Sequence, residues 1–118
     1  MSSNIDSKEK RKIKIGIVAG EESGDSLGAS LIKDLKEIFP SSHFVGVGGK
    51  KMQLEGLDSF FEMKNISVMG IIEPLVRISE LLKLRKELKE YLSKEAPDIF
   101  IGIDSPDFNL SISKHLKN

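Results

Sequence analysis

The chain has 118 residues, and its 18 Lys and Arg balance 18 Asp and Glu, so the formal net charge is zero. Zero net charge argues against a strongly basic nucleic-acid-binding protein, and we expect no nucleic-acid partner. Hydrophobic residues make up 39% and charged residues 31%, which is typical of one soluble globular domain. The absence of cysteine excludes disulfides and thiolate metal sites and fits a reducing compartment.

The first 11 residues are polar, and we expect a disordered leader there, followed by one domain over residues 12–118. The apolar run that follows, IGIVAG, is shorter than the roughly 7–15 residues of a signal-peptide core. No stretch approaches the roughly 20 apolar residues that span a bilayer. We therefore expect a cytoplasmic protein.

Short apolar runs alternate along the chain with segments of helical periodicity. Strands are expected where β-branched and aromatic residues gather, over residues 13–18, 43–49, 57–62 and 96–104. Helices are expected over residues 25–39, 50–56, 71–94 and from residue 105 onward. The expected apolar stripes are Leu27, Leu31, Ile32, Leu35 and Ile38 in the first helix, and Leu75, Ile78, Leu81, Leu82, Leu88, Tyr91 and Leu92 in the long one.

This alternation implies βαβ crossovers and an α/β fold with a mostly parallel sheet covered on both faces. The last predicted strand is followed by a helix and by no closing strand, which is typical of half of a doubly wound sheet. In open sheets of this kind, ligands bind beyond the carboxyl ends of the strands. Three segments are expected there: GEESGD, GVGGKKM and GIDSPDFN.

The first of these segments carries three carboxylates where a phosphate-binding turn would have glycines and a lysine. Glu21, Glu22 and Asp25 would repel a phosphate and would instead accept hydrogen bonds from neutral hydroxyls, as on a sugar. The alternative is a structural role, in which Ser23 and Asp25 cap the following helix and the glutamates are solvated. The local pattern alone favours capping.

The third segment places Asp104 directly after an apolar strand, so its carboxylate is expected at the mouth of the sheet. Partial burial there would raise its pKa, which suits a general base. Two alternatives remain open. Asp104 can cap a turn, with Pro106 at the first helical position, or Asp104 and Asp107 can hold a divalent cation.

Two basic segments have weaker patterns. Lys50 and Lys51 follow the glycines of the second strand, and they can either meet a phosphate or form a solvated face. The segment KLRKELK, residues 83–89, can rest against anionic lipid, although the polar side of a helix is the simpler interpretation.

Four runs of the sequence resemble, in order and spacing, the opening part of the lipid-A-disaccharide synthase family of bacterial glycosyltransferases. They are VAGEESGDSLGASLIKDLK, FVGVGGKKMQLEG, VMGIIEPLVRISELLKLRKEL and PDIFIGIDSPDFNL. The resemblance extends over nearly the whole chain from about Lys12. It is specific because A-G-E-x-S-G-D, V-M-G-I-x-E and G-I-D-x-P-D-F-N occur together.

The resemblance implies a partial, Rossmann-like N-terminal domain of a two-domain GT-B glycosyltransferase of lipopolysaccharide biosynthesis. It implies an inverting transfer from UDP-2,3-diacylglucosamine to 2,3-diacylglucosamine 1-phosphate. The products would be a β-1,6-linked lipid A disaccharide 1-phosphate and UDP. It implies no metal and no cofactor, a lipid-linked sugar phosphate as the partner of this domain, and a peripheral contact with the cytoplasmic face of the inner membrane.

The same resemblance assigns roles to individual residues. Asp104 matches the aspartate of G-I-D-x-P-D-F-N and is expected to be the general base for the acceptor 6-hydroxyl, with Glu21 as the alternative base. The substrate-binding residues expected from the matching motifs are Ser23, Gly24, Asp25, Val68, Met69, Gly70 and Asn109. Residues 68–70 among them match a segment expected to contact an acyl chain.

The chain is less than half as long as a typical family member, and we expect the UDP-binding domain to be missing from it. An inverting transfer needs donor and acceptor held together, so we expect this chain to be inactive alone. The donor would bind through the C-terminal domain, carried by a second chain or missing from an incomplete gene product. Two other functions remain open: a non-catalytic lipid-sugar-binding remnant, and an unrelated flavodoxin-like or nucleotide-binding domain. An open sheet edge would also favour self-association.

Overall fold

The structure, a computed structural model, describes residues 12–63, 74–103 and 106–117. The expected leader over residues 1–11 lies outside the described residues. The expected strands and helices are present, with bounds that differ from those expected by a few residues. In chain order they are β1 (Lys14–Ala19), α2 (Glu22–Ile38), β2 (His43–Val47), α3 (Lys50–Leu54), β3 (Leu57–Ser59), α5 (Pro74–Glu95), β4 (Ile99–Ile103) and α6 (Pro106–Lys117).

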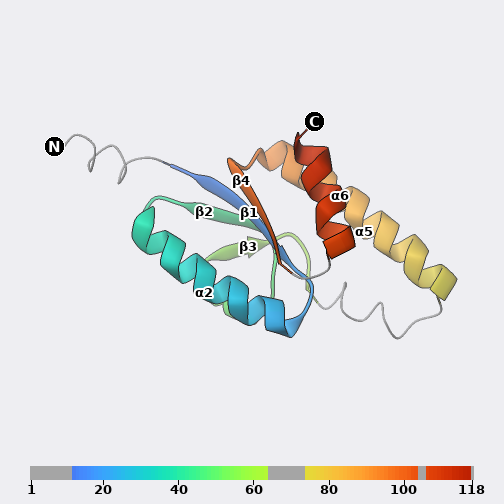
Figure 1. The fold of residues 1–118 in the computed structure, drawn as a ribbon, viewed down its shortest axis with the longest axis horizontal. Coiled ribbons are helices and arrows are strands. Elements are labelled where there is room, and N and C mark those ends of the chain that lie inside the picture. Colours follow the sequence, from blue (N-terminus) through green and yellow to red (C-terminus); the bar gives the residue numbers. More distant parts are fainter. Residues whose placement is uncertain (1–11, 64–73, 104–105, 118) are drawn as a thin grey trace.

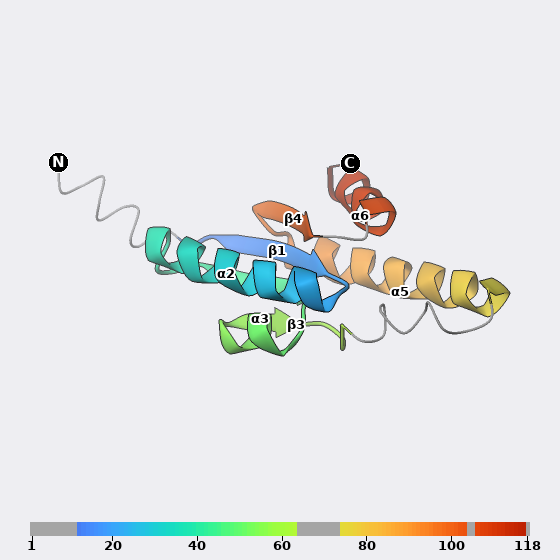
Figure 2. The same ribbon diagram turned by 60° about the horizontal axis from the view of Figure 1, so that its bottom comes forward.

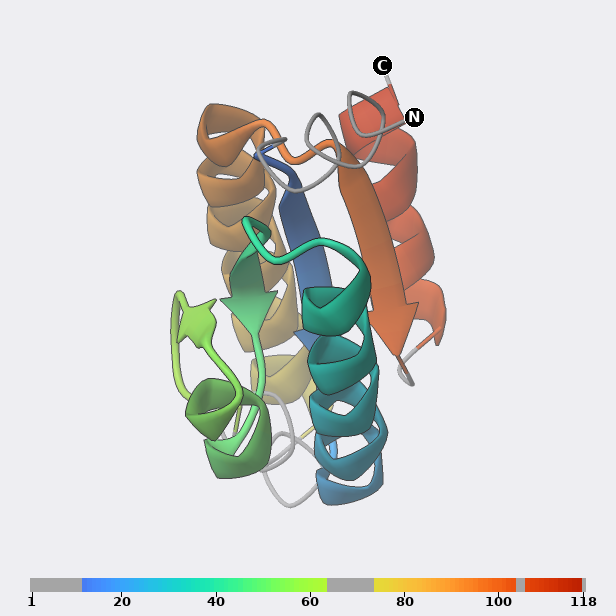
Figure 3. The ribbon, with the colours of Figure 1, turned by 90° about the vertical axis from the view of Figure 1, so that its left-hand side faces the viewer.

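The strands form one parallel sheet in the order β3-β2-β1-β4. Helices α2 and α3 cover one face of this sheet, and α5 and α6 cover the other (Figures 1 and 3). The α/β, Rossmann-like architecture expected from the sequence is confirmed. The chain runs outward from β1 to β3 and then returns to the opposite side of β1 as β4. The direction of winding therefore reverses between β1 and β4, and ligands of open α/β sheets bind at such a reversal.

The hydrophobic core lies on both sides of the central strand β1. Ile15 and Ile17 of β1 are fully buried, because a parallel strand covered on both faces is apolar at successive positions. One helical layer contributes Ile32 from α2, and the other contributes Leu88 and Leu92 from α5. The strand that leads into the acidic turn is thus held by packing from both layers.

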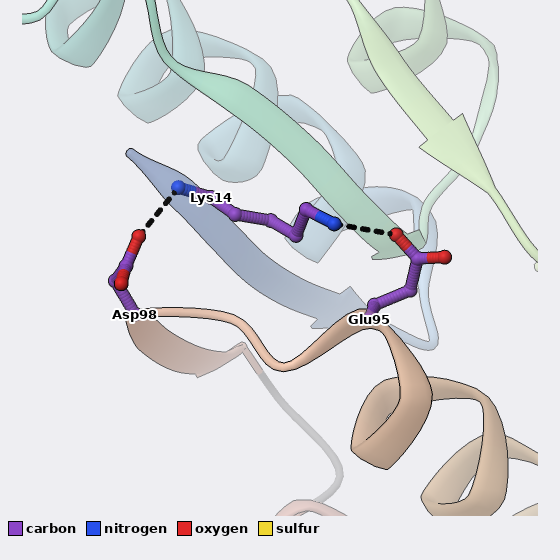
Figure 4. Close-up of polar contacts among 3 residues, drawn as sticks. All are labelled: Lys14, Glu95 and Asp98. Carbon is purple, nitrogen blue, oxygen red and sulfur yellow. Dashed lines mark hydrogen bonds and ion pairs between the residues drawn. The ribbon is translucent and has the colours of Figure 1, made fainter. Parts of the chain in front are cut away.

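A polar cluster at the amino end of the sheet joins β1 to the connection between α5 and β4 (Figure 4). The Lys14 N–H donates to the Asp98 carboxylate at 2.9 Å, and the Asp98 N–H donates to the Lys14 carbonyl at 2.7 Å. Lys14 Nζ also contacts Glu95 at 3.0 Å, a partly exposed ion pair that adds little stability by itself. These bonds extend the β1–β4 ladder beyond the pairing of Ile15 with Ile99 and hold its register.

The predicted apolar stripes of the two long helices are only partly correct. Leu27 and Ile38 of α2, and Ile78 and Leu82 of α5, are about half exposed or more. In α2 the buried face passes through Gly28 instead of Leu27, because α3 packs closely there. The N-terminal half of α5 extends past the ends of the strands, so it has no sheet to cover (Figures 1 and 2).

Tyr91 of α5 stacks on the ring of Phe60, which follows β3, with ring centroids 4.3 Å apart and ring planes inclined by 13°. Partial burial raises the pKa of Tyr91 to about 12, and the negative charges of Asp58 and Glu95 act in the same direction. The Tyr91 phenol therefore stays neutral up to a higher pH than a free tyrosine does.

A spectroscopic titration tests this environment, because the chain has one tyrosine and no tryptophan. We expect phenolate absorbance to rise with a midpoint near pH 12 in the folded chain and near pH 10 in urea. Since the folded pKa lies above the unfolded one, the associated stability is fully present below about pH 10 and is lost between pH 10 and 12. A midpoint near 10 in the folded chain would contradict the packing described for Tyr91.

The outer edge of β4 generates a second prediction, because among the described residues β4 pairs only with β1. Open strand edges favour association between copies, and Ile99 on this edge is 47% exposed. We expect the chain to self-associate with rising concentration and Ile99→Lys to shift it toward the monomer in analytical ultracentrifugation. The control is Leu54→Lys on α3. Leu54 is more exposed than Ile99, and α3 packs beside β3, the strand farthest from β4 in the sheet order. Equal effects of both substitutions would rule out the β4 edge as the contact.

Candidate functional site

The acidic turn connects the carboxyl end of β1 to α2, at the end of the sheet toward which the strand arrowheads point (Figure 3). Glu21 is the residue before α2 and is exposed, and its carbonyl accepts the Asp25 N–H at 2.9 Å. The helix begins at Glu22, so Ser23 lies inside the first turn, and no side chain caps this helix end. The predicted capping of α2 by Ser23 is therefore wrong, and the Ser23 side chain is exposed.

Asp25 has a structural role different from the one the sequence suggested. Its side chain is 6% exposed and points to the start of α3 instead of capping its own helix. One carboxylate oxygen, Oδ1, accepts the N–H groups of Gly49 at 2.8 Å and Met52 at 3.0 Å. The other, Oδ2, accepts the Lys51 N–H at 3.1 Å. A carboxylate is well suited to this position, because the first N–H groups of a helix have no partner within it.

Close packing accompanies this cross-helix cap. A Cβ at Gly49 would lie 2.5 Å from Asp25 Oδ2, and a Cβ at Gly28 would lie 2.6 Å from Met52 Sδ. A side chain at either position would displace Met52 or Asp25, so the two glycines let the β2–α3 connection approach α2. The acidic turn and the glycine-rich segment after β2, separate in sequence, form one hydrogen-bonded unit.

A cavity of about 580 Å³ lies beside this unit, at the carboxyl end of the sheet. Its walls come from the first turns of α2, from the start of α3 and from the residues after β3. The lining residues are Glu22, Ser23, Asp25, Ser26, Gly49, Lys50, Lys51, Glu62 and Met63. Its carboxylates, hydroxyls and two ammonium groups lie among a larger area of apolar side-chain surface, and they are groups that can bind a hydroxylated ligand.

The structure brings some of the expected site residues together. Ser23 and Asp25 line the cavity, Gly24 is buried in α2, and Glu21 is exposed next to the cavity residues but is not among them. Asn109 lies in α6, and the surroundings of its side chain lie outside the described residues. The expected residues whose position lies outside the described part are Val68, Met69, Gly70 and Asp104.

The carboxyl ends of β1 and β4 are neighbours, which is the arrangement that the sequence hypothesis requires. Ala19 pairs with Ile103 in the parallel ladder, and both residues are buried. Glu21 follows Ala19 by two residues in the chain, and Asp104 follows Ile103 directly. The backbone of the described residues therefore leads both carboxylate-bearing segments out of the sheet at adjacent strand ends.

Over residues 12–63, 74–103 and 106–117 there is no group of three or more His, Cys, Asp or Glu side chains that could hold a metal ion. Within the same ranges, no helix is long and apolar enough to cross a membrane.

The comparison with known families bears directly on this geometry. The family model described as lipid-A-disaccharide synthetase matches residues 15–118, which is nearly the whole chain. This chain belongs to the lipid-A-disaccharide synthetase family. The family predicted from the motifs of the acidic turn and of the β4 end is thereby confirmed.

Individual members of the family show the same similarity. The lipid-A-disaccharide synthase of Aliivibrio fischeri is 51% identical over 108 residues, that of Pectobacterium carotovorum 51% over 107, and that of Pseudoalteromonas translucida 50% over 111. These matches cover 91–94% of this chain but only 28–29% of each relative. The chain thus spans less than a third of the length of these family members.

Sequence reasoning missed three residues of the cavity wall: Ser26, Glu62 and Met63. Ser26 lies directly after the motif A-G-E-x-S-G-D, and its position in the first turns of α2 was available from the helix prediction. Glu62 and Met63 follow the short strand β3, and no pattern in the sequence indicates that they face α2. Only the packing of α3 on α2 brings them to the same cavity.

The cross-helix cap leads to a stability prediction. Asp25→Ala leaves three N–H groups without their acceptor and is expected to lower the free energy of unfolding by about 3 kcal/mol. Asp25→Asn keeps one carbonyl oxygen for Gly49 and Met52, and is expected to cost about 1 kcal/mol. Urea unfolding followed by circular dichroism measures both. The control, Asp34→Ala at an exposed position of the same helix, should change stability by less than about 0.5 kcal/mol. Equal losses for Asp25→Ala and Asp34→Ala would contradict the cap.

Proposed function

We propose that this chain is the acceptor-side part of a lipid-A-disaccharide synthase. The reaction is the transfer of 2,3-diacylglucosamine from its UDP derivative to 2,3-diacylglucosamine 1-phosphate. It forms a β-1,6-linked lipid A disaccharide 1-phosphate and releases UDP. Membership of the family supports this proposal, since the relatives are named lipid-A-disaccharide synthases.

The observation that carries the proposal is the adjacency of two strand ends. The pairing of Ala19 with Ile103 brings the segments that begin with Glu21 and Asp104 to the same end of the sheet. This position is the reversal point of the winding, where open α/β sheets bind ligands. Of two carboxylates that follow neighbouring strand ends, one can serve as the general base and the other as a hydrogen-bond acceptor that positions the sugar hydroxyl.

In the proposed mechanism, Asp104 accepts the proton of the acceptor 6-hydroxyl as that oxygen attacks C1 of the donor sugar. The bond from C1 to the UDP oxygen breaks as the new bond forms on the opposite side, so the anomeric centre inverts. Glu21 and Ser23 hold the acceptor hydroxyls, and Glu21 is the alternative base. Asn109 and Gly24 contribute to the same acceptor site. Asp25 contributes by fixing the walls of the site, because three backbone amides already occupy its carboxylate.

The second substrate, the donor, is proposed to bind through a further domain. The chain matches less than a third of its relatives, and an inverting transfer needs both sugars in one site. We therefore propose that this chain alone does not complete the transfer. In this proposal, UDP-2,3-diacylglucosamine binds through a further domain of GT-B type, on the same polypeptide or on a second chain.

A membrane contact is part of the same proposal. The N-terminal half of α5 exposes Ile78 and Leu82, and Lys83 and Lys86 beside them are also exposed. Apolar side chains flanked by lysines favour an anionic membrane surface. Residues 68–70, which precede α5, are proposed to contact an acyl chain of the acceptor. The site would then face the cytoplasmic side of the inner membrane.

A chimera tests the proposed function. Residues 12–118 of this chain replace the matching segment of the Aliivibrio fischeri relative, and disaccharide formation is measured with both lipid substrates. We expect the chimera to be active and Asp104→Asn to lower the rate by roughly 10²–10⁴-fold, the contribution of a general base. Glu21→Gln is expected to cost at least about tenfold, the effect of one lost hydrogen bond to a charged group.

The matched controls are Asp34→Asn and Glu37→Gln, two exposed carboxylates of α2, and both should leave the rate unchanged. A folded but inactive chimera would contradict the proposed function. Full activity of Asp104→Asn would remove Asp104 as the base and leave Glu21 as the candidate.

A further inference from the structure

We infer that the cavity beside the acidic turn binds the anionic group of a sugar phosphate, with Lys50 and Lys51 as the cationic wall. The proposed function leaves both lysines without a role. The inference deepens that proposal, since the assignment of the sugar phosphate to the acceptor rests on it. The ligand class itself is argued from the cavity alone.

The amino groups of the two cavity lysines have no ion-pair partner among the described residues. Among the described residues the ion pairs are Lys14 with Glu95 and Lys36 with Glu55, so no carboxylate lies within 4.0 Å of the amino groups of Lys50 and Lys51. Both side chains are exposed and line the cavity. Two ammonium groups that face a cavity without a paired carboxylate favour an anionic ligand group.

One of the two lysines is held in place. The backbone N–H of Lys51 and those of its neighbours Gly49 and Met52 are bound by the buried carboxylate of Asp25. The ammonium group of Lys51 donates to Ser26 Oγ at 2.9 Å, from α3 to α2. Lys51 is therefore positioned before a ligand arrives, which reduces the entropy lost on binding.

The other residues that line the cavity supply acceptors for a sugar. Glu22, Ser23 and Glu62 have carboxylate and hydroxyl oxygens, which accept hydrogen bonds from sugar hydroxyls. These carboxylates would oppose a bare anion without hydroxyls. A ligand that carries both hydroxyls and a phosphate can bind the carboxylate and hydroxyl oxygens as well as the lysines, whereas inorganic phosphate can bind only the lysines.

Two sources of phosphate exist in the proposed reaction, and we assign the cavity to the acceptor. Ser23, which is proposed to hold acceptor hydroxyls, lines this same cavity with Lys50 and Lys51. The acceptor therefore reaches the lysines without leaving the domain described above.

Titrations followed by amide shifts in NMR spectra test the inference on the complete 118-residue chain. The probes are glucosamine 1-phosphate, glucosamine, inorganic phosphate and UDP. We expect glucosamine 1-phosphate to bind at least about tenfold more tightly than inorganic phosphate or UDP, and to shift the amides of residues 23–26 and 49–51. The double variant Lys50→Gln with Lys51→Gln should weaken this binding about fivefold or more, and should leave glucosamine unaffected.

The matched control removes two exposed lysines outside the cavity, with Lys33→Gln and Lys94→Gln, and it should bind glucosamine 1-phosphate as the parent chain does. Equal weakening in both double variants would overturn the inference, because it would indicate a general charge effect. The inference would also be overturned if inorganic phosphate bound as tightly as the sugar phosphate, if UDP bound more tightly, or if glucosamine 1-phosphate did not bind.

An inactive chimera with lysine-dependent binding would reject the proposed function alone. An active chimera with unchanged binding in Lys50→Gln and Lys51→Gln would reject this inference alone.

Discussion

The rest of the structure depends on the parallel pairing of β1 with β2 on one side and β4 on the other. This pairing buries β1 between two helical layers, and it brings the acidic turn to the end of the sheet at which β4 also emerges. The bonds between Lys14 and Asp98 hold the register at the amino end, so Ala19 meets Ile103 at the carboxyl end. A register shift of one residue would exchange the faces of β4 and move its end away from the turn.

Asp25 connects the sheet and α2 to the cavity. Its carboxylate is nearly inaccessible to solvent, and three backbone N–H groups, from a segment more than 20 residues away in the chain, replace water as its hydrogen-bond donors. These bonds fix the backbone that carries Lys51, whose ammonium group donates to Ser26 of α2. The first turns of α2 and the lysines at the start of α3 thus line one cavity.

Local patterns in the sequence predicted the elements, their order and the parallel sheet, because periodicity and turn residues act within a few positions. They did not predict partners between elements. Leu27 has the spacing of a core residue, yet it is exposed, since α3 packs on Gly28. The sequence pattern suggests that Asp25 caps its own helix, and only the structure shows that it caps α3. The family was identified from runs of motif residues, which are specific even where each motif alone has a structural explanation.

The most direct test of the account is chemical crosslinking of cysteines at positions 21 and 104. The native chain has no cysteine, so Glu21→Cys with Asp104→Cys offers one pair of thiols. If the ends of β1 and β4 form one site, a short thiol-reactive spacer should join this pair efficiently, as detected by mass spectrometry. The control pair, Glu21→Cys with Glu95→Cys, lies at opposite ends of the sheet and should not be joined. Crosslinking of positions 21 and 104 no better than that of the control pair would contradict the shared site.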